Sequence, residues 1–219
     1  MISLPIDNNR TKKQRICPLC QGKSSPFYQD RFFLCPECKG IFVTPENIPS
    51  PKEEKERYET HNNDMDDPRY RKFVSPITSA IMAAHSPKKK GLDFGCGTGP
   101  VISAVLREND YNIAPYDPYF ADNPDLLERT YDYIACCEVV EHFRDPRREF
   151  QRLKGLLKNK GNLYIMTQPY EENMDFAGWR YKDDPTHIFF YHRETWEFIK
   201  KEYGFSSLSI DARLIILTA

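Results

Sequence analysis

The stretch Gly91-Leu-Asp-Phe-Gly-Cys-Gly-Thr-Gly99 decides the fold of this 219-residue chain. It is a short apolar run that leads directly into a glycine-rich turn, and glycines let a backbone approach a ligand closely before turning into a helix. Asp117 follows twenty-two residues after Gly95, at the end of a second expected strand. A carboxylate about 20 residues after such a turn suits the two hydroxyls of a ribose. The two features together predict that the chain binds an adenosine-containing cofactor.

The spacing of the glycines narrows the choice of cofactor. A dinucleotide-binding turn has the pattern G-x-G-x-x-G, with its third glycine where the helix packs on the strand. Here the spacing is Gly95-x-Gly97-x-Gly99, with Pro100 at the place of that third glycine, and an acid lies two residues before the first glycine. Three further stretches follow along the chain: Tyr116-Asp117-Pro118, Tyr131-Asp-Tyr-Ile-Ala-Cys-Cys-Glu138-Val-Val-Glu141-His142 and Gly161-Asn-Leu-Tyr-Ile-Met-Thr167.

These motifs, in this order, resemble those of class I S-adenosylmethionine-dependent methyltransferases, and the resemblance covers residues 58–219. It implies an α/β, Rossmann-like fold whose sheet is mostly parallel, with an antiparallel hairpin at its C-terminal end. It implies S-adenosylmethionine as the cofactor, whereas the alternative is a glycine turn that serves packing only. The residues that would bind the cofactor are Asp93, Gly95, Cys96, Gly97, Gly99, Asp117, Pro118 and Glu138.

Strand and helix patterns alternate after residue 91, which is typical of a parallel sheet with helices on both faces. Only fourteen residues separate Asp117 from Asp132, so we expect the usual third strand to be reduced to a turn near residues 124–127. No residue is assigned to hold the adenine, because Asp122 and Asp125 are the only acids available there. The other expected strands cover residues 91–94, 111–116, 131–137 and 162–167, followed by two strands within 206–219, and a last helix covers 193–203.

A candidate catalytic centre follows the expected strand 131–137, at the edge of the sheet where ligands bind in this fold. Glu138, Glu141 and His142 share one face of a helical turn, and His187 comes after the next strand. Two carboxylates and imidazoles suit a divalent cation such as Mg²⁺ or Mn²⁺. The set resembles two groups of metal-dependent 2'-O- or catechol-type O-methyltransferases, one that methylates the terminal ribose of small RNAs and one that makes ubiquinone. The run His187-x-Phe189-x-x-x-Arg193 resembles the RNA group.

The alternative without metal assigns the roles differently. Glu141-His142 is then a loop-orienting pair, and His187 is the general base, because imidazole titrates near neutral pH; a histidine hydrogen-bonded in a strand is the structural alternative. The catalytic residues in either version are His187, Glu138 and His142. Trp179 and Tyr181 lie in the loop that closes the acceptor pocket in this fold, as pocket walls or as a cover for the sheet.

Two paired cysteine motifs precede the glycine motif. Cys17-Pro-Leu-Cys20 and Cys35-Pro-Glu-Cys38 are separated by fourteen residues rich in β-formers. Two such turns facing each other place four thiolates tetrahedrally around Zn²⁺. A segment this short needs the free energy of metal binding to fold. We therefore predict a zinc ribbon over residues 1–44.

The role of the ribbon has two interpretations. Residues 1–40 hold seven basic against three acidic side chains, and Phe27, Tyr28, Phe32 and Phe33 offer rings that stack on bases, so the ribbon could hold RNA. The interpretation we favour is a structural module whose aromatic residues pack on the main domain.

An acidic linker, residues 45–66, joins the ribbon to the methyltransferase domain, residues 67–219. Charge alternation predicts a helix near residues 52–60, and Asp67-Pro68 predicts the start of the next helix. Segments before the first strand often cover the cofactor in this fold. Tyr58 and His61 are therefore candidates for a lid, with a plain polar linker as the alternative.

Composition restricts the class of protein. The net charge of −1 gives no general attraction to nucleic acid or anionic membranes, and no apolar run approaches the ~18 residues of a membrane span. The polar N-terminus and the paired cysteines predict a cytoplasmic protein. We expect a methyltransferase acting on a small-molecule hydroxyl or amine; the alternatives are an RNA methyltransferase and a non-catalytic methyltransferase-like binding protein. The sequence does not identify the acceptor or the oligomeric state.

Overall fold

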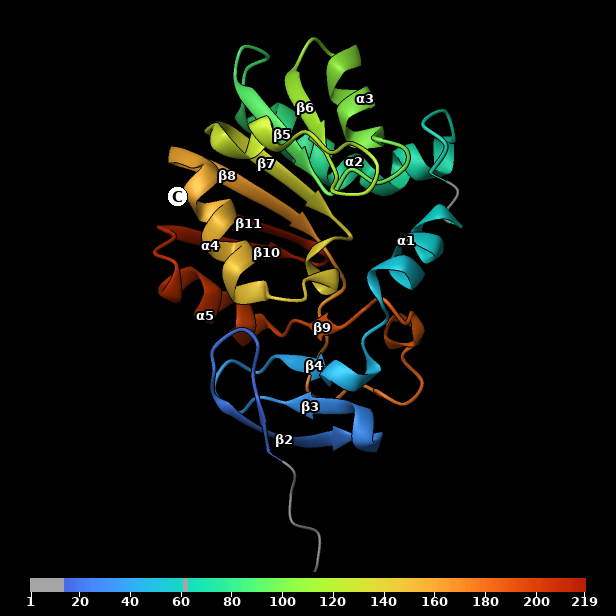
Figure 1. The fold of residues 1–219 in the computed structure, drawn as a ribbon. Coiled ribbons are helices and arrows are strands. Elements are labelled where there is room, and N and C mark those ends of the chain that lie inside the picture. The colour runs from blue at the N-terminus through green and yellow to red at the C-terminus, as the bar shows by residue number, and fades with distance from the viewer. Residues whose placement is uncertain (1–13, 61–62) are drawn as a thin grey trace, which may run out of the picture.

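The computed structural model describes residues 14–60 and 63–219. The main sheet consists of six strands, which are β5 (Lys90–Phe94), β6 (Asn112–Tyr116), β7 (Tyr131–Cys137), β8 (Leu157–Met166), β10 (Ser207–Asp211) and β11 (Leu214–Thr218). Their order across the sheet is β10-β11-β8-β7-β5-β6 (Figure 1). β5 to β8 pair in parallel, whereas β11 and β10 are antiparallel. The predicted α/β fold with its antiparallel C-terminal hairpin is therefore confirmed.

Two helices cover each face of this sheet (Figure 1). α2 (Pro68–Ala84) and α3 (Val101–Glu108) bury Val74, Ile77 and Leu106 on one face, together with Tyr133 of β7. α4 (Pro146–Leu156) and α5 (Arg193–Glu202) cover the other face. Their buried side chains include Phe150, Leu153, Trp196 and Ile199. No helix in residues 14–60 or 63–219 has the length and apolarity needed to cross a membrane.

Short-range signals set the helix ends. Asp67 accepts a hydrogen bond from the Arg69 amide at 2.8 Å, and Asp145 accepts one from the Arg148 amide at 3.0 Å. In both helices proline follows at the first position, where its missing N–H has no partner to lose. The helix start predicted at Asp67-Pro68 is confirmed.

The sheet ends at β6, as the short spacing before Asp132 predicts. A single 3₁₀ turn, η3 (Pro124–Glu128), stands in place of a further helix and strand. Pro115 lies on β6, which pairs only with β5. Proline is tolerated on an edge strand because the missing N–H costs no ladder hydrogen bond there.

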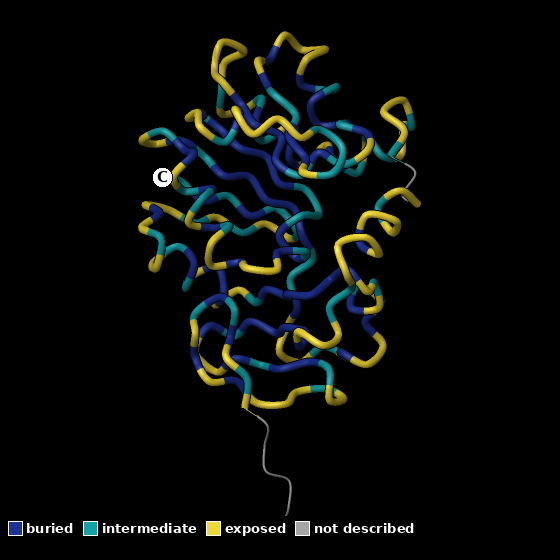
Figure 2. The backbone as a smooth tube through the Cα atoms, viewed as in Figure 1, coloured by how far each residue is buried: buried dark blue, intermediate teal, exposed yellow. Residues whose placement is uncertain are grey.

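A second, five-stranded antiparallel sheet contains the cysteine motifs. Its strands in spatial order are β1 (Arg15–Ile16), β2 (Lys23–Tyr28), β3 (Phe32–Leu34), β4 (Ile41–Val43) and β9 (Phe189–Phe190). The first four form the predicted ribbon, but β9 comes from the C-terminal half of the chain. Buried backbone runs through both sheets (Figure 2). Cys17, Cys35 and Cys38 share one apolar cluster with Phe150 and Trp196 of the main domain. The boundaries at residues 44 and 66 stay predictions.

The linker contains the predicted helix, α1 (Pro51–Glu59). Ser50 and Glu53 form a capping box at its start, with the Ser50 amide donating to Glu53 at 2.8 Å. Ion pairs with i,i+4 spacing join Lys52 to Glu56 and Lys55 to Glu59. Four short 3₁₀ turns complete the elements used below: η1 (Gln29–Arg31), η2 (Pro45–Asn47), η4 (Val140–His142) and η5 (Arg180–Asp183).

Candidate functional site

A cavity of about 780 Å³ opens at the carboxyl ends of β5, β6 and β7. Small-molecule sites measure roughly 300–1,000 Å³ and lie at this edge of such sheets. The glycine loop and Asp117 line one part of the cavity, and Tyr181 and His187 line another. The other sequence-predicted residues that line it are Cys96, Pro118, Glu138 and His142.

The glycine loop is held by the neighbouring strand. The amides of Gly95 and Cys96 both donate to the carbonyl oxygen of Tyr116, at 2.8 and 3.1 Å. Gly95 and Gly97 have φ of +78° and +65°, which side chains rarely adopt. A Cβ at Gly95 would lie 2.5 Å from Val139, so the loop also needs glycine to pass the residue after β7.

Gly99 serves a different contact from the rest of the loop. A Cβ there would lie 1.7 Å from the carbonyl oxygen of Asn63, in the segment that follows α1. Gly99 is also absent from the residues that line the cavity. The structure therefore places Gly99 against the linker rather than against a bound cofactor.

Asp117 organises the turn beside the glycine loop. Its Oδ2 accepts from the Gly97 amide at 3.0 Å, and its Oδ1 accepts from the amides of Tyr119 and Phe120 at 2.8 and 3.2 Å. A carboxylate has about four acceptor positions. Asp117 therefore keeps capacity for ligand hydroxyls while it joins the two loops that border the cavity.

Asp93 lies beneath the glycine loop and does not line the cavity. It is fully buried, and its Oδ2 accepts from the Ser103 hydroxyl at 2.8 Å and the Ser103 amide at 3.2 Å. Burial raises its pKa to about 6, although both bonds to Ser103 oppose the shift. The structure thus gives Asp93 a role in fixing the first turn of α3, not the cofactor contact that the motif predicts.

Three of the four residues predicted as a divalent-cation site converge on the other side of the cavity. The ligand atoms of Glu141, His142 and His187 all lie within 4.8 Å of one another. Nδ1 of His142 is 2.8 Å from the Thr186 carbonyl oxygen, and Nδ1 of His187 is 2.6 Å from that of Tyr181. A carbonyl only accepts, so Nδ1 of each ring carries a proton and donates to the backbone.

Glu138 is brought into the cavity but not into this cluster. It has φ of +52° and pairs with Arg213 at 2.7 Å. The Tyr181 hydroxyl lies 3.2 Å from Glu138 and also bonds Glu141, with the Thr167 hydroxyl 3.1 Å away. The sequence predicts Tyr181 as a wall or a cover, whereas its hydroxyl lies between the two carboxylates.

The pKa values of the two carboxylates and of His187 are shifted from their usual ranges. Burial, followed by the charge of Glu141, raises the pKa of Glu138 to about 8, and Arg213 opposes this shift. Burial also raises the pKa of Glu141 and lowers that of His187. Titratable groups perturbed by burial and by one another, and gathered in a cleft, mark a functional site.

Helix α1 lies at the mouth of the cavity. Glu54 pairs with Arg144 at 2.7 Å and accepts from the Tyr58 hydroxyl at 2.8 Å, while Arg57 pairs with Asp184 at 2.7 Å. The Tyr58 ring lies 5.3 Å from that of His142, so Tyr58 occupies the predicted lid position. His61 lies outside the described residues.

Sequence reasoning missed Glu54, Arg144 and Arg213. Many other charged residues lie on helices and turns, so these three do not stand out in the sequence. Glu54 and Arg144 pair with each other across 90 positions, and Arg213 pairs with Glu138 across 75 positions. Glu54 is the only buried residue of α1, and one buried charge gives only a weak signal in the sequence. No local pattern therefore identifies these pairs.

The four cysteines of the ribbon also converge, with ligand atoms within 4.8 Å of one another. Sγ of Cys17 lies 3.6 Å from that of Cys38, and Sγ of Cys20 lies 3.3 Å from that of Cys35. Four sulfurs about 2.3 Å from a central ion have separations near these values. The cluster fits the predicted zinc ribbon.

The aromatic residues of the ribbon mostly face inward. Phe32 and Phe33 are buried, and Tyr28 is half-buried. Phe27 is 43% exposed, although its ring packs edge-on against Phe176 at 5.0 Å. Phe32 and Phe33 therefore cannot stack on bases as the RNA interpretation requires.

Comparison with known proteins identifies the family of the chain. A family model described as a methyltransferase domain matches residues 66–210. A ubiquinone biosynthesis O-methyltransferase of Erwinia tasmaniensis is 29% identical over 91 residues, which cover 42% of this chain and 37% of that protein. A protein of the same name from Histophilus somni is 26% identical over 119 residues, with 42% and 48% covered. The chain spans less than half the length of these curated relatives.

Solved structures agree on the fold. A SAM-dependent methyltransferase from Archaeoglobus fulgidus has a TM-score of 0.54 at 16% identity, covering 78% of this chain and 100% of that one. An O-methyltransferase family protein from Burkholderia thailandensis has a TM-score of 0.51 at 13% identity, with 75% and 61% covered. At these identities the similarity concerns the fold alone.

Asp93→Asn should change how stability depends on pH. Because the folded-state pKa is raised from 3.8 to about 6, this carboxyl lowers stability progressively as pH rises from about 4 to 6. The substituted amide keeps an acceptor for Ser103 but never ionises, so between pH 4 and 7 the variant should gain on the order of 2 kcal/mol relative to wild type. Urea unfolding at several pH values measures this gain. A stability difference that stays constant with pH would contradict the burial of an ionisable Asp93.

Proposed function

Since the chain belongs to the methyltransferase-domain family, we propose that it transfers the methyl group of S-adenosylmethionine to a hydroxyl oxygen of a small molecule. The observation that carries the proposal is that one cavity joins the glycine loop and Asp117 to His142 and His187. A cofactor-binding half and a proton-accepting half thus share the same space.

The cofactor half fits S-adenosylmethionine. Gly97 turns with positive φ beside the cavity, and Asp117 lies at the end of β6 with acceptor capacity for a ribose. Tyr70 and Phe73 of α2 add apolar walls. The bound cofactor supplies a methyl group already activated on sulfonium, so the protein has mainly to hold the acceptor oxygen in line with it.

The acceptor half supplies a base. Nε2 of His187 is the ring atom that accepts a proton, since Nδ1 donates to the Tyr181 carbonyl. Burial keeps the pKa of His187 low, so the ring is neutral near pH 7. The adjacent Glu141 carboxylate favours the imidazolium that forms when the acceptor hydroxyl loses its proton.

A divalent cation is the alternative way to activate the hydroxyl. Glu141, His142 and His187 would hold it, and a bound cation would lower the pKa of the acceptor hydroxyl. One carboxylate and two imidazoles suit Mn²⁺ or Zn²⁺ better than Mg²⁺. Glu138 would not be a ligand in this version, because it pairs with Arg213.

A small acceptor is favoured over RNA. α1 covers the mouth of the cavity through Glu54 and Arg57, and two of the four ribbon aromatics are buried. The similarity to O-methyltransferases supports oxygen as the methylated atom. We further propose that Cys17, Cys20, Cys35 and Cys38 bind one structural Zn²⁺.

Asp117→Asn should weaken binding of S-adenosylmethionine about tenfold or more, since loss of a charge-assisted hydrogen bond costs roughly 1.5–3 kcal/mol. Asp125→Asn is the matched control, because Asp125 is exposed and does not line the cavity. Calorimetry with the cofactor and its demethylated product measures both variants. Equal affinities in the two variants would exclude Asp117 as the ribose ligand.

His187→Gln should lower turnover about 10²–10⁴-fold, the usual contribution of a general base. In wild type the pKa of His187 lies below 6.5, so the ring stays mostly neutral as the pH falls to 6.5. We therefore expect kcat/KM to hold down to pH 6.5 and to decline at lower pH. His85→Gln is the control, because its ring packs on Tyr133 outside the cavity lining. A variant as active as the control would remove His187 from the mechanism.

Loss of activity with a chelator, restored by Mn²⁺ while the ribbon keeps its zinc, would instead assign the cation version.

Elemental analysis of the purified protein should find one zinc per chain. The four ribbon thiols should then resist thiol reagents until the metal is removed, because thiolates bound to zinc are poor nucleophiles. Protein that contains no zinc and reacts at Cys17, Cys20, Cys35 and Cys38 would refute the zinc site.

A further inference from the structure

Strand β9 belongs to the ribbon sheet although it lies beside the candidate catalytic residues. It begins two positions after His187 and pairs antiparallel with β4, Phe189 opposite Phe42. Ile188 is the residue between His187 and β9. Its carbonyl accepts from the Val43 amide, and its amide donates to the Glu141 carbonyl, both at 2.9 Å. A single residue therefore connects the ribbon to the loop that bears Glu141.

The second cysteine turn packs directly on this strand. The Cys35 amide donates to the Gly40 carbonyl at 2.9 Å, and the Lys39 amide donates to the Cys35 carbonyl at 3.0 Å. A Cβ at Gly40 would lie 2.4 Å from the Phe189 ring, which is completely buried. The turn that holds Cys35 and Cys38 therefore packs closely on Phe189, which lies two positions after His187.

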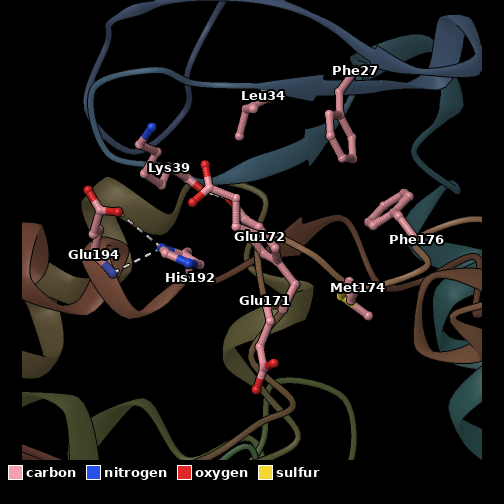
Figure 3. A pocket seen from close by; sticks show the side chains of 10 residues that line it. Phe27, Leu34, Lys39, Glu171, Glu172, Met174, Phe176, His192 and Glu194 are labelled. Atoms are coloured by element: carbon pink, nitrogen blue, oxygen red, sulfur yellow. Dashed lines mark hydrogen bonds and ion pairs between the residues drawn. The ribbon is translucent and has the colours of Figure 1, made fainter.

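A second route leads from the same turn to the same loop. The Tyr170 hydroxyl donates to the Lys39 carbonyl, and the Tyr170 amide donates to the Tyr191 carbonyl at 3.0 Å. The Tyr191 hydroxyl in turn donates to the Val140 carbonyl at 2.8 Å. Beside this route lies a small cavity of about 60 Å³, lined by Phe27 and Leu34 of the ribbon and by Met174 and Phe176 (Figure 3).

We propose that the zinc ribbon is a positioning element of the acceptor site. Zinc fixes the turn of Cys35 and Cys38, this turn fixes β4 and β9, and β9 holds His187 and Glu141 in reach of the acceptor. The inference rests on the proposed function for the role of His187. The cofactor half should not depend on zinc, because β5 and β6 do not pair with β9.

The reason is that β9 cannot hold itself in place. It has two residues, and its only ladder partner among the described strands is β4, which has three. Ladders this short are not stable alone. The ribbon is also too small to fold on an apolar core without metal. Removal of zinc should therefore release β9 while the main sheet stays folded.

Gly40→Ala tests the coupling without touching a thiol, because the added Cβ displaces Phe189 and leaves all four cysteines. Gly22→Ala is the matched control: Gly22 stands after the first cysteine turn as Gly40 stands after the second, and its Cβ would meet only the exposed, flexible carboxylate of Glu37, at 2.6 Å. Both variants should keep one zinc and bind the cofactor within about threefold of wild type. Gly40→Ala should lower kcat about 10- to 100-fold, because small misplacements cost this much, whereas Gly22→Ala should not.

Amide exchange provides a readout that does not depend on turnover. In Gly40→Ala, and in wild-type protein stripped of zinc, the amides of Val43 and Ile188 should exchange faster, and returning zinc to the wild type should restore their protection. Unchanged exchange and kcat in Gly40→Ala would overturn the proposal, as would a loss of cofactor affinity as large as the loss of kcat. If wild type methylates no hydroxyl at all, the proposed function fails, and amide exchange still decides whether zinc positions His187.

Discussion

The backbone of Ile188 forms hydrogen bonds on both sides, and the position of the ribbon relative to the loop after β7 depends on these two bonds. Its carbonyl completes the ladder with β4 of the ribbon, and its amide binds the Glu141 carbonyl in the loop after β7. Two sheets that differ in topology are thereby joined through one residue, and the apolar core continues from the cysteine turns to Phe150 and Trp196. The ribbon is accordingly part of the same folded body as the main sheet.

Placing carboxylates in that body is unfavourable unless they are paired. Glu141 is fully buried and Glu138 is half-buried, and removing two like charges from water raises the pKa of both. Arg213, from the C-terminal hairpin, compensates Glu138, and the Tyr181 hydroxyl lies between the two groups. The C-terminal hairpin, often described as the edge of this fold, here supplies a counter-charge to the site.

Much of the main sheet could be predicted because its signals are local. The bounds of β7 and the caps Asp67 and Asp145 follow from a few neighbouring residues. The pairing of β9 with β4 could not be predicted, because about 150 positions separate two very short strands. The partner of the Asp93 side chain could not be predicted for a related reason. The motif places an acid before the glycine loop, but only the packing of α3 brings Ser103 to that acid.

The contact between Gly99 and Asn63 has a consequence for substitutions in the glycine loop. A Cβ at position 99 would overlap the carbonyl oxygen of Asn63, so glycine is needed there for the backbone after α1 to lie this close to the loop. The ion pairs that hold α1, Glu54 with Arg144 and Arg57 with Asp184, each join a half-exposed arginine to a largely buried carboxylate. A side chain at position 99 would therefore strain a linker that is held both at the mouth of the cavity and at the glycine loop.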